Sequence, residues 1–177
     1  FADEQSRVIA ATVDTATGPL RIVNGYFVNG QEPGSEKFAY KMRWLEALHA
    51  YLRAELSAHP QLALLGDFNV IPEDKDVWAP AAMASDALMQ PESRDAYFRL
   101  LGDGWTDALA THYPQGRVWT YWDFQAGAWQ RDHGFRIDHL LLSPLLADRL
   151  VACGVDKDHR GREKASDHAP TWIELAA

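Results

Sequence analysis

The sequence predicts an α/β fold, a layered sandwich of two mixed β-sheets flanked by helices. Three observations support this prediction. Short runs typical of strands come in pairs, one long amphipathic helix follows the first pair, and later strands alternate with short helices. The chain of 177 residues is 47% hydrophobic and 24% charged, which is the composition of a folded domain and excludes disorder.

The first half of the chain contains a predicted hairpin, a helix and a buried strand. Residues 7–13 and 20–27 are rich in β-branched and aromatic side chains, and the residues between them favour a turn. Apolar side chains spaced three and four residues apart predict a helix over residues 36–58 that Ser35 caps. The apolar run 62–65 predicts a buried strand that stops at Gly66.

The second half is less regular. Residues 70–104 predict irregular structure with short helices, one of them near 92–101, and residues 105–134 form an aromatic, turn-rich surface. We expect strands at 136–142, 150–155 and 169–175, and a short helix after Pro144. No repeat or internal boundary is visible, so residues 1–177 are expected to form a single domain.

Composition also limits the compartment and the partners. The single cysteine, Cys153, cannot form an internal disulfide, which predicts a reducing, cytoplasmic location. The apolar runs are too short to span a membrane, so no membrane partner is expected. The net charge of −8 argues against a general nucleic-acid coat protein, but it allows an enzyme that holds a few phosphates and keeps carboxylates for a metal.

Polar side chains gather where the predicted strands end. Asp67 and Asn69 follow the buried strand, and their spacing puts both on one side of an extended chain, where they would suit a hard cation or a phosphoryl oxygen. Asp167 and His168 lie in the loop before the last strand, where they could act on a metal and a phosphate. For both pairs a simple turn is the alternative.

Two more strand ends carry polar groups. Asp138 could pair with the imidazole of His168 and fix its tautomer, or it could only cap a strand. The phenol of Tyr26 could meet a phosphate, or its ring could only pack. Because open α/β sheets bind ligands beyond their strand ends, the four clusters together predict Mg²⁺-assisted hydrolysis of a phosphoester.

Five motifs resemble the exonuclease III (AP endonuclease) family of the endonuclease/exonuclease/phosphatase superfamily. In order they are G-Y-F-V-N-G at 25–30, L-L-G-D-F-N at 64–69, W-T-Y-W-D-F at 119–124, F-R-I-D-H-L-L-L-S at 135–143 and S-D-H-A-P at 166–170. G-D-F-N and S-D-H-A-P are common to the superfamily, whereas Y-F-x-N-G and T-Y-W-D-F are typical of its DNA-repair branch. The resemblance covers residues 7–175 and implies a DNase I-like fold.

The resemblance implies a role for each matching residue. Asp67 would be the general acid/base, Asn69 would stabilise the phosphoryl oxygens, and His168 would contact the scissile phosphate. Asp138 would orient His168, and Tyr26 would hydrogen-bond the phosphate. Asn29 would lie near the phosphate. The implied Mg²⁺ ligands are Asp67, Asn69 and Asp167, with Mn²⁺ as the alternative ion. A pocket for a flipped-out abasic sugar would be lined by Tyr121, Trp122, Phe135 and Ile137.

The implied function is a Mg²⁺-dependent DNA phosphodiesterase of base-excision repair. It would act as an abasic-site endonuclease and as a 3′–5′ exodeoxyribonuclease on double-stranded DNA with an abasic site or a 3′ end. Two alternatives remain open. One is another phosphodiesterase, phosphatase or deadenylase of the superfamily, and the other is a catalytically incomplete fragment that binds DNA without turnover.

The sequence departs from the family in two ways. Val28 stands where the family usually has proline. The family also begins with a segment, about its first third, that carries an asparagine and a glutamate metal ligand and is expected to precede Phe1. We therefore expect an incomplete metal site, little nuclease activity of this chain alone, and unpaired edges at the hairpin 7–27 and the strand 62–65. Either that segment is supplied elsewhere or the chain self-associates.

Overall fold

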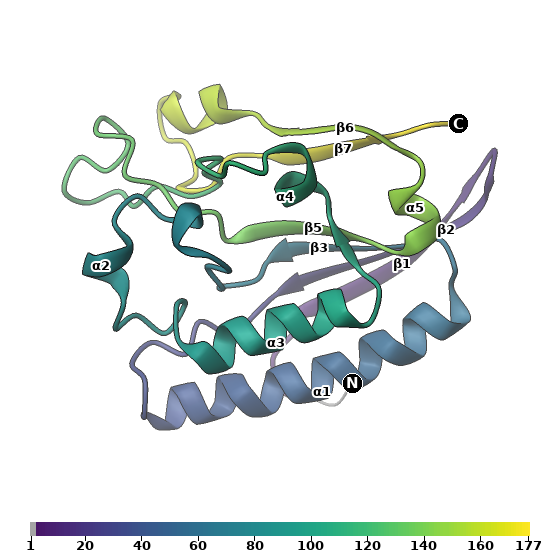
Figure 1. Ribbon diagram of the computed structural model, residues 1–177, viewed down its shortest axis with the longest axis horizontal. Coiled ribbons are helices and arrows are strands. Elements are labelled where there is room, and N and C mark those ends of the chain that lie inside the picture. The colour runs from purple at the N-terminus through teal and green to yellow at the C-terminus, as the bar shows by residue number, and fades with distance from the viewer. Residues whose placement is uncertain (1–2) are drawn as a thin grey trace.

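The computed structural model describes residues 3–177, and its strands form two sheets (Figure 1). The strands are β1 (Val8–Thr15), β2 (Gly18–Tyr26), β3 (Leu62–Asp67), β4 (Thr106–Asp107), β5 (Asp138–Leu142), β6 (Leu150–Val155) and β7 (Thr171–Leu175). The α-helices are α1 (Glu36–Ala58), α2 (Pro80–Met83), α3 (Pro91–Gly102), α4 (Ala108–His112) and α5 (Pro144–Ala147). Short 3-10 turns occupy Asp74–Asp76 and Lys157–Gly161.

The larger sheet has the strand order β1-β2-β3-β5-β4 and is mixed. β1 and β2 form the predicted antiparallel hairpin, β2 runs parallel to β3, and β5 is antiparallel to β3. α1 makes the crossover that two parallel neighbours require. Among the described residues the second sheet is the antiparallel pair β6-β7 alone, so the prediction of two mixed sheets is right only for the first.

The core lies in two layers on either side of the larger sheet (Figure 1). α1 and α3 cover one face, and β6, β7 and α4 lie over the other. The alternation of β3 explains this arrangement, because Leu62 and Leu64 join the helix-side cluster, whereas Ala63 joins the cluster with Leu109 and Cys153. One short strand therefore supports both layers.

Local signals set most element boundaries as predicted. The helix over residues 36–58 is confirmed, and the Ser35 hydroxyl accepts a hydrogen bond from the Phe38 N–H at 3.2 Å. The predicted strands are all present within two residues of their expected ends. β4 and α4 lie inside a segment that the sequence marked only as a surface; the Asp107 carboxylate caps α4 by accepting from the Ala110 N–H at 3.0 Å.

One expectation about exposed edges is wrong. The strand predicted at 62–65 is β3, which is hydrogen-bonded to β2 on one side and to β5 on the other, so it has no free edge. The edge strands of the larger sheet are the two-residue β4 and the eight-residue β1, where Ile9 is 70% exposed. Across residues 3–177, no helix combines the length and the apolar character needed to cross a membrane.

Candidate active site

Strand register brings the predicted motifs together. Tyr26 at the end of β2 lies opposite Asp67 at the end of β3, and Asp67 lies opposite Asp138 at the start of β5. Because β2 and β3 are parallel, both present their carboxyl ends at the same edge of the sheet. Gly66 permits the close approach of these strands: its φ is +131°, and a Cβ there would lie 2.0 Å from the Gly25 carbonyl oxygen.

A cavity of about 440 Å³ opens at this edge of the sheet. Most of the predicted site residues contribute to its wall. The lining side chains are Tyr26, Asn29, Asp67, Asn69, Met83, Asp86, Leu88, Tyr121, Asp123, Phe135, Ile137, Asp167 and His168. Residues from all five sequence motifs therefore face one space.

His168 is held by Asp138. Its Nδ1 donates to Asp138 Oδ2 at 2.8 Å, because a carboxylate can only accept, and this fixes the tautomer and leaves Nε2 4.0 Å from Asp67 Oδ2. Burial alone would lower the pKa of His168, but the hydrogen bond and the charge of Asp138 outweigh it and raise the pKa. The imidazole is thus tuned toward its protonated, phosphate-binding form.

Asp67 has an unusual carboxylate. Burial, reinforced by the charge of Asp138, raises its pKa from 3.8 to about 6, against the hydrogen bond from the Asn69 backbone and the charge of His168. Its Oδ1 accepts from the Asn69 N–H at 2.9 Å and its Oδ2 from Asn69 Nδ2 at 3.2 Å. A carboxyl group with a pKa near neutrality can both take and give a proton at physiological pH.

A buried lysine that sequence analysis missed holds the backbone carbonyl groups of Asn29 and Asn69, whose side-chain amides bind each other. Asn29 Nδ2 donates to Asn69 Oδ1 at 2.9 Å. Lys41 of α1 is fully buried, and its Nζ donates to the carbonyl oxygens of Asn29 at 3.1 Å and Asn69 at 2.8 Å. Burial lowers the pKa of Lys41 to about 8. Its signal in the sequence is its place three residues after Phe38, on the apolar face of the helix.

Three of the four predicted pocket residues form an apolar wall, and the fourth does not. Tyr121, Phe135 and Ile137 line the cavity, and the Tyr121 ring lies 5.0 Å from the His168 ring. Trp122 is 0% exposed and packs in the cluster of Trp119, so its predicted place in the pocket is wrong. Its neighbour Tyr121 takes the cavity side, and successive side chains of an extended segment point to opposite sides.

Trp122 supports the site indirectly. Its backbone N–H donates to the Asp167 carbonyl at 2.9 Å, and its Nε1 donates to Asp132 Oδ1 at 3.0 Å. Trp122 thus connects the loop that carries Asp167 to the segment that carries Asp132.

Four carboxylates contribute to the cavity wall, those of Asp67, Asp86, Asp123 and Asp167. Oxygen donors of this kind suit a hard divalent cation. Within residues 3–177, however, no three His, Cys, Asp or Glu side chains lie close enough to enclose a metal ion. The residues present therefore fit a divalent metal by chemistry and supply only part of a coordination shell.

A buried ionic network lies behind the site. The Arg136 guanidinium binds Asp76 through Nε at 2.8 Å and Nη2 at 3.0 Å, and Asp107 through Nη1 at 2.5 Å. His139 accepts from Arg136 at 2.9 Å and contacts the Val70 carbonyl at 3.0 Å. The network joins the loop after β3 to the start of β5, the two segments that carry Asn69 and Asp138.

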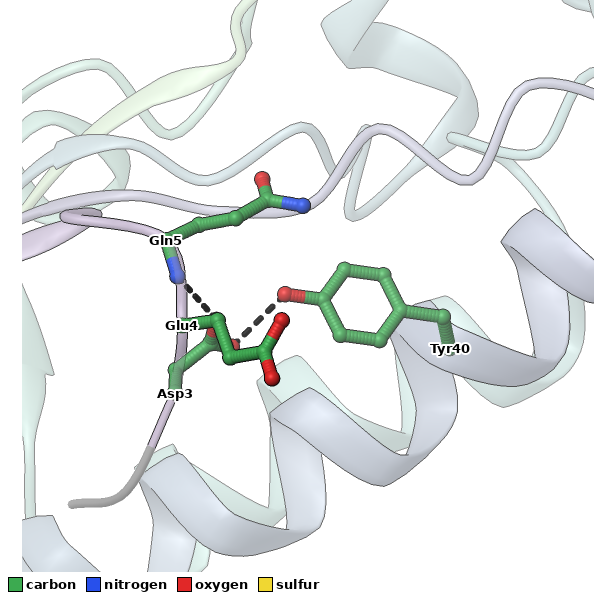
Figure 2. A pocket seen from close by; sticks show the side chains of 4 residues that line it. All are labelled: Asp3, Glu4, Gln5 and Tyr40. Atoms are coloured by element: carbon green, nitrogen blue, oxygen red, sulfur yellow. Dashed lines mark hydrogen bonds between the residues drawn. The ribbon is translucent and has the colours of Figure 1, made fainter.

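Another hollow lies on α1, where the N-terminal segment crosses the helix (Figure 2). Figure 2 shows the Tyr40 hydroxyl donating to Asp3 Oδ2, at 2.6 Å, and the Gln5 N–H donating to Asp3 Oδ1, at 2.7 Å. The Tyr40 bond fastens the segment to the helix, and the Gln5 bond stabilises a turn within the segment. The predicted catalytic residues are not among those that line this hollow.

The fold and site define a class of metal-assisted phosphoester hydrolases. A profile of the Endonuclease/Exonuclease/phosphatase family matches residues 4–168, and the chain belongs to that family. It is of the exonuclease III type: it is 34% identical to exodeoxyribonuclease III of Haemophilus influenzae, over 98% of this chain and 68% of that protein. Enzymes of this type hydrolyse phosphodiester bonds of DNA and generally use divalent metals.

Solved structures agree with this assignment. A 3′ phosphatase from Neisseria, bound to a product DNA hairpin, superposes with a TM-score of 0.94 and is 39% identical, over 99% of this chain and 66% of that one. An AP endonuclease from Archaeoglobus fulgidus superposes with a TM-score of 0.86 at 33% identity, over 95% of this chain and 65% of that one. The chain thus spans about two thirds of the length of these relatives.

Proposed function

We propose that the protein is a Mg²⁺-dependent DNA phosphodiesterase that cuts beside abasic sites and removes nucleotides from 3′ ends. The observation that carries the proposal is the His168–Asp138 pair facing the Asp67 carboxylate across one cavity, with an apolar wall beside them. Double-stranded DNA is the proposed substrate, and a reducing, cytoplasmic location fits the single buried Cys153.

Each polar residue has a proposed part in the hydrolysis. Asp67, with a pKa near 6, takes a proton from the attacking water or returns one to the leaving oxygen. His168 donates from Nε2 to a non-bridging oxygen of the scissile phosphate while Asp138 holds its other nitrogen. Tyr26 donates to a phosphoryl oxygen as negative charge develops there, while Asn69 Nδ2, which donates to the Phe27 carbonyl at 2.9 Å and to Asp67 Oδ2 at 3.2 Å, holds the Asp67 carboxylate in place.

Mg²⁺ is the proposed ion, with Mn²⁺ as the substitute. Asp167, Asp67 and Asn69 would hold it, and it would neutralise phosphoryl charge during the reaction. The carboxylates of Asp67, Asp86, Asp123 and Asp167 around one cavity support a bound cation, because a positive charge among them would offset their mutual repulsion.

The apolar wall supports selectivity for an abasic sugar. Tyr121, Phe135 and Ile137 form a surface that suits a deoxyribose without its base. A nucleotide that lacks a base costs less to unstack than an intact one, so it enters such a pocket most readily.

The test is cleavage of DNA by the natural gene product that contains this chain. We expect Asp67→Asn and His168→Ala to lower kcat for an abasic duplex at least about a hundredfold, because they remove proton transfer and a phosphate donor. The matched control is His112→Ala, since His112 is exposed on α4 and outside the cavity lining. Near-parental turnover of the Asp67 variant would refute the assigned role.

A second candidate is removal of a 3′ phosphate from a DNA end, which the similarity to the Neisseria 3′ phosphatase favours. The same residues would serve, because both reactions displace a 3′ oxygen from phosphorus. Comparing kcat/KM for an abasic duplex, a recessed 3′-hydroxyl end and a 3′-phosphate nick decides between them. A preference of tenfold or more for the 3′-phosphate nick would replace the first proposal.

A further inference from the structure

A second cavity adjoins the active site and carries a different set of side chains. It is lined by Val77, Trp78, Arg117, Trp119, Arg131, Asp132 and His133. None of these residues has a role in the proposed hydrolysis. It combines one exposed aromatic ring, that of Trp78, with arginines, a combination that binds nucleic-acid strands.

The aromatic part is a preformed stack. The rings of Trp78 and His133 lie with centroids 3.5 Å apart and planes within 1° of parallel. Trp78 is 42% exposed although its ring is large and apolar. Since His133 covers one side of the indole, the exposure leaves area for another flat ring, such as a nucleobase, to stack.

The second cavity carries positive charge from Arg117 and Arg131, although the net charge of the chain is −8. Arg117 and Arg131 are both exposed, and neither guanidinium lies within 4.0 Å of a carboxylate among residues 3–177. The one acid in the lining, Asp132, is already occupied by Lys157 Nζ at 2.7 Å and by the indole nitrogen of Trp122 at 3.0 Å. Two arginines therefore remain available for phosphates.

The same chain segments line both cavities. Phe135 faces the active site, while His133, two residues earlier, belongs to the stack. The backbone N–H groups of Thr120 and Tyr121 donate to the Phe135 carbonyl at 2.8 and 3.1 Å, and the Trp78 N–H donates to the Gly134 carbonyl at 3.1 Å. A polymer whose phosphate occupies the first cavity can therefore continue over the second.

We propose that Trp78, His133, Arg117 and Arg131 form a strand-binding subsite for DNA next to the scissile phosphate. A base stacks on Trp78, and the two arginines contact the flanking phosphates. The inference rests on the proposed function, because it needs DNA in the active site. It adds a specific contact that would hold a frayed or unpaired end, where a base is free to stack.

The test measures DNA binding by the natural gene product without added metal, so that no cleavage intervenes. A fluorescent duplex with a short single-stranded end reports binding by anisotropy. We expect Trp78→Ala to weaken binding roughly 5- to 150-fold, the range for losing one stacked base. Trp78→Phe should stay within about threefold of the parent, because it keeps an aromatic face.

The arginines are tested by salt dependence. Arg117→Gln combined with Arg131→Gln should reduce the slope of log K against log salt concentration by roughly 1.4 to 1.8, since each lost phosphate contact removes about 0.7 to 0.9. Arg53→Gln with Arg162→Gln is the charge-matched control, because both arginines are exposed and outside the cavity. Neither control substitution should change that slope.

Trp172→Ala is the matched aromatic control. Trp172 lies on β7, is 41% exposed and is not part of either lining. The inference is overturned if Trp78→Ala binds DNA within twofold of the parent, if Trp172→Ala loses as much, or if polyglutamate displaces the DNA as well as unlabelled strand does. If the parent cuts DNA normally while these outcomes hold, only the subsite fails. A parent that neither binds nor cuts DNA would refute the proposed function as well.

Discussion

Replacing Arg136 with leucine tests the buried ionic network behind the active site. The guanidinium is 3% exposed, and its removal would leave Asp76 (1% exposed) and Asp107 (4% exposed) without their cation. Breaking a buried pair by deleting one partner costs about 3–5 kcal/mol, and two stranded carboxylates put the expected loss of unfolding free energy in the upper half of that range. For a domain of this size the loss corresponds to a fall in Tm of roughly 8–20 °C.

The loss should also depend on pH. Burial by itself raises the pKa of Asp107, but His139 and Arg136 outweigh it and hold the pKa well below the usual 3.8. In the parent this carboxylate therefore stabilises the fold throughout pH 5–7, and its contribution disappears only as the pH falls below 3.8. In Arg136→Leu, His139 remains but the guanidinium no longer opposes burial, so the pKa of the Asp107 carboxyl group rises relative to the parent, and protonation at pH 5 should recover part of the lost stability.

Urea unfolding at pH 7 and pH 5, followed by circular dichroism, measures both effects. Arg99→Leu is the control, because its pair with Glu46 at 2.8 Å is solvent-exposed and should contribute less than about 1 kcal/mol. A loss below about 1 kcal/mol at pH 7, or an equal loss at both pH values, would refute this account of the network.

Three further predictions concern the site and the sheet edge. Without metal, Asp67→Asn should raise the unfolding free energy at pH 7 by up to about 3 kcal/mol, because the pKa of Asp67 is about 6 in the fold and 3.8 in the unfolded chain, which makes its ionisation in the fold costly. This gain should shrink toward pH 4.5. Equal stability of variant and parent at pH 7, measured by urea unfolding, would contradict the prediction. The pKa of Lys41 is about 8 in the fold and 10.5 in the unfolded chain, so the unfolded chain binds more protons between pH 8 and pH 10.5. The unfolding free energy of the parent, relative to that of Lys41→Met, should therefore rise by up to about 3 kcal/mol over this range. A difference between the two proteins that does not change with pH would refute this. We expect the purified 177-residue chain to self-associate through the β1 edge, and light scattering should show Ile9→Lys with Val13→Lys reducing the apparent mass; unchanged mass would exclude this edge.

The sequence by itself determined the elements whose signals are local. The helix from Glu36 to Ala58 follows from one cap, one apolar period and Pro60, all within the segment that folds. The polar residues at strand ends were equally visible, because Asp67, Asp138 and His168 stand beside apolar runs that predict the strands. Their convergence was expected from the rule that ligands bind beyond strand ends.

Tertiary structure decided the features that depend on contacts between distant segments. β3 is central because β5, some seventy residues later, pairs with its far side, and no local signal reports that pairing. Trp122 lies in the core and Tyr121 in the cavity, although both belong to one aromatic motif, because the path of the backbone chooses which side chain faces inward.

The charged groups show the same division. Lys41 and Arg136 read as ordinary polar residues, yet both are buried, because carbonyls and carboxylates from separate loops surround them only in the folded chain. The stack of Trp78 on His133 likewise joins residues that are far apart in sequence. Sequence patterns thus determine which chemistry is present, and folding determines which groups share a cavity, because burial and electrostatic interaction depend on distances between side chains in space.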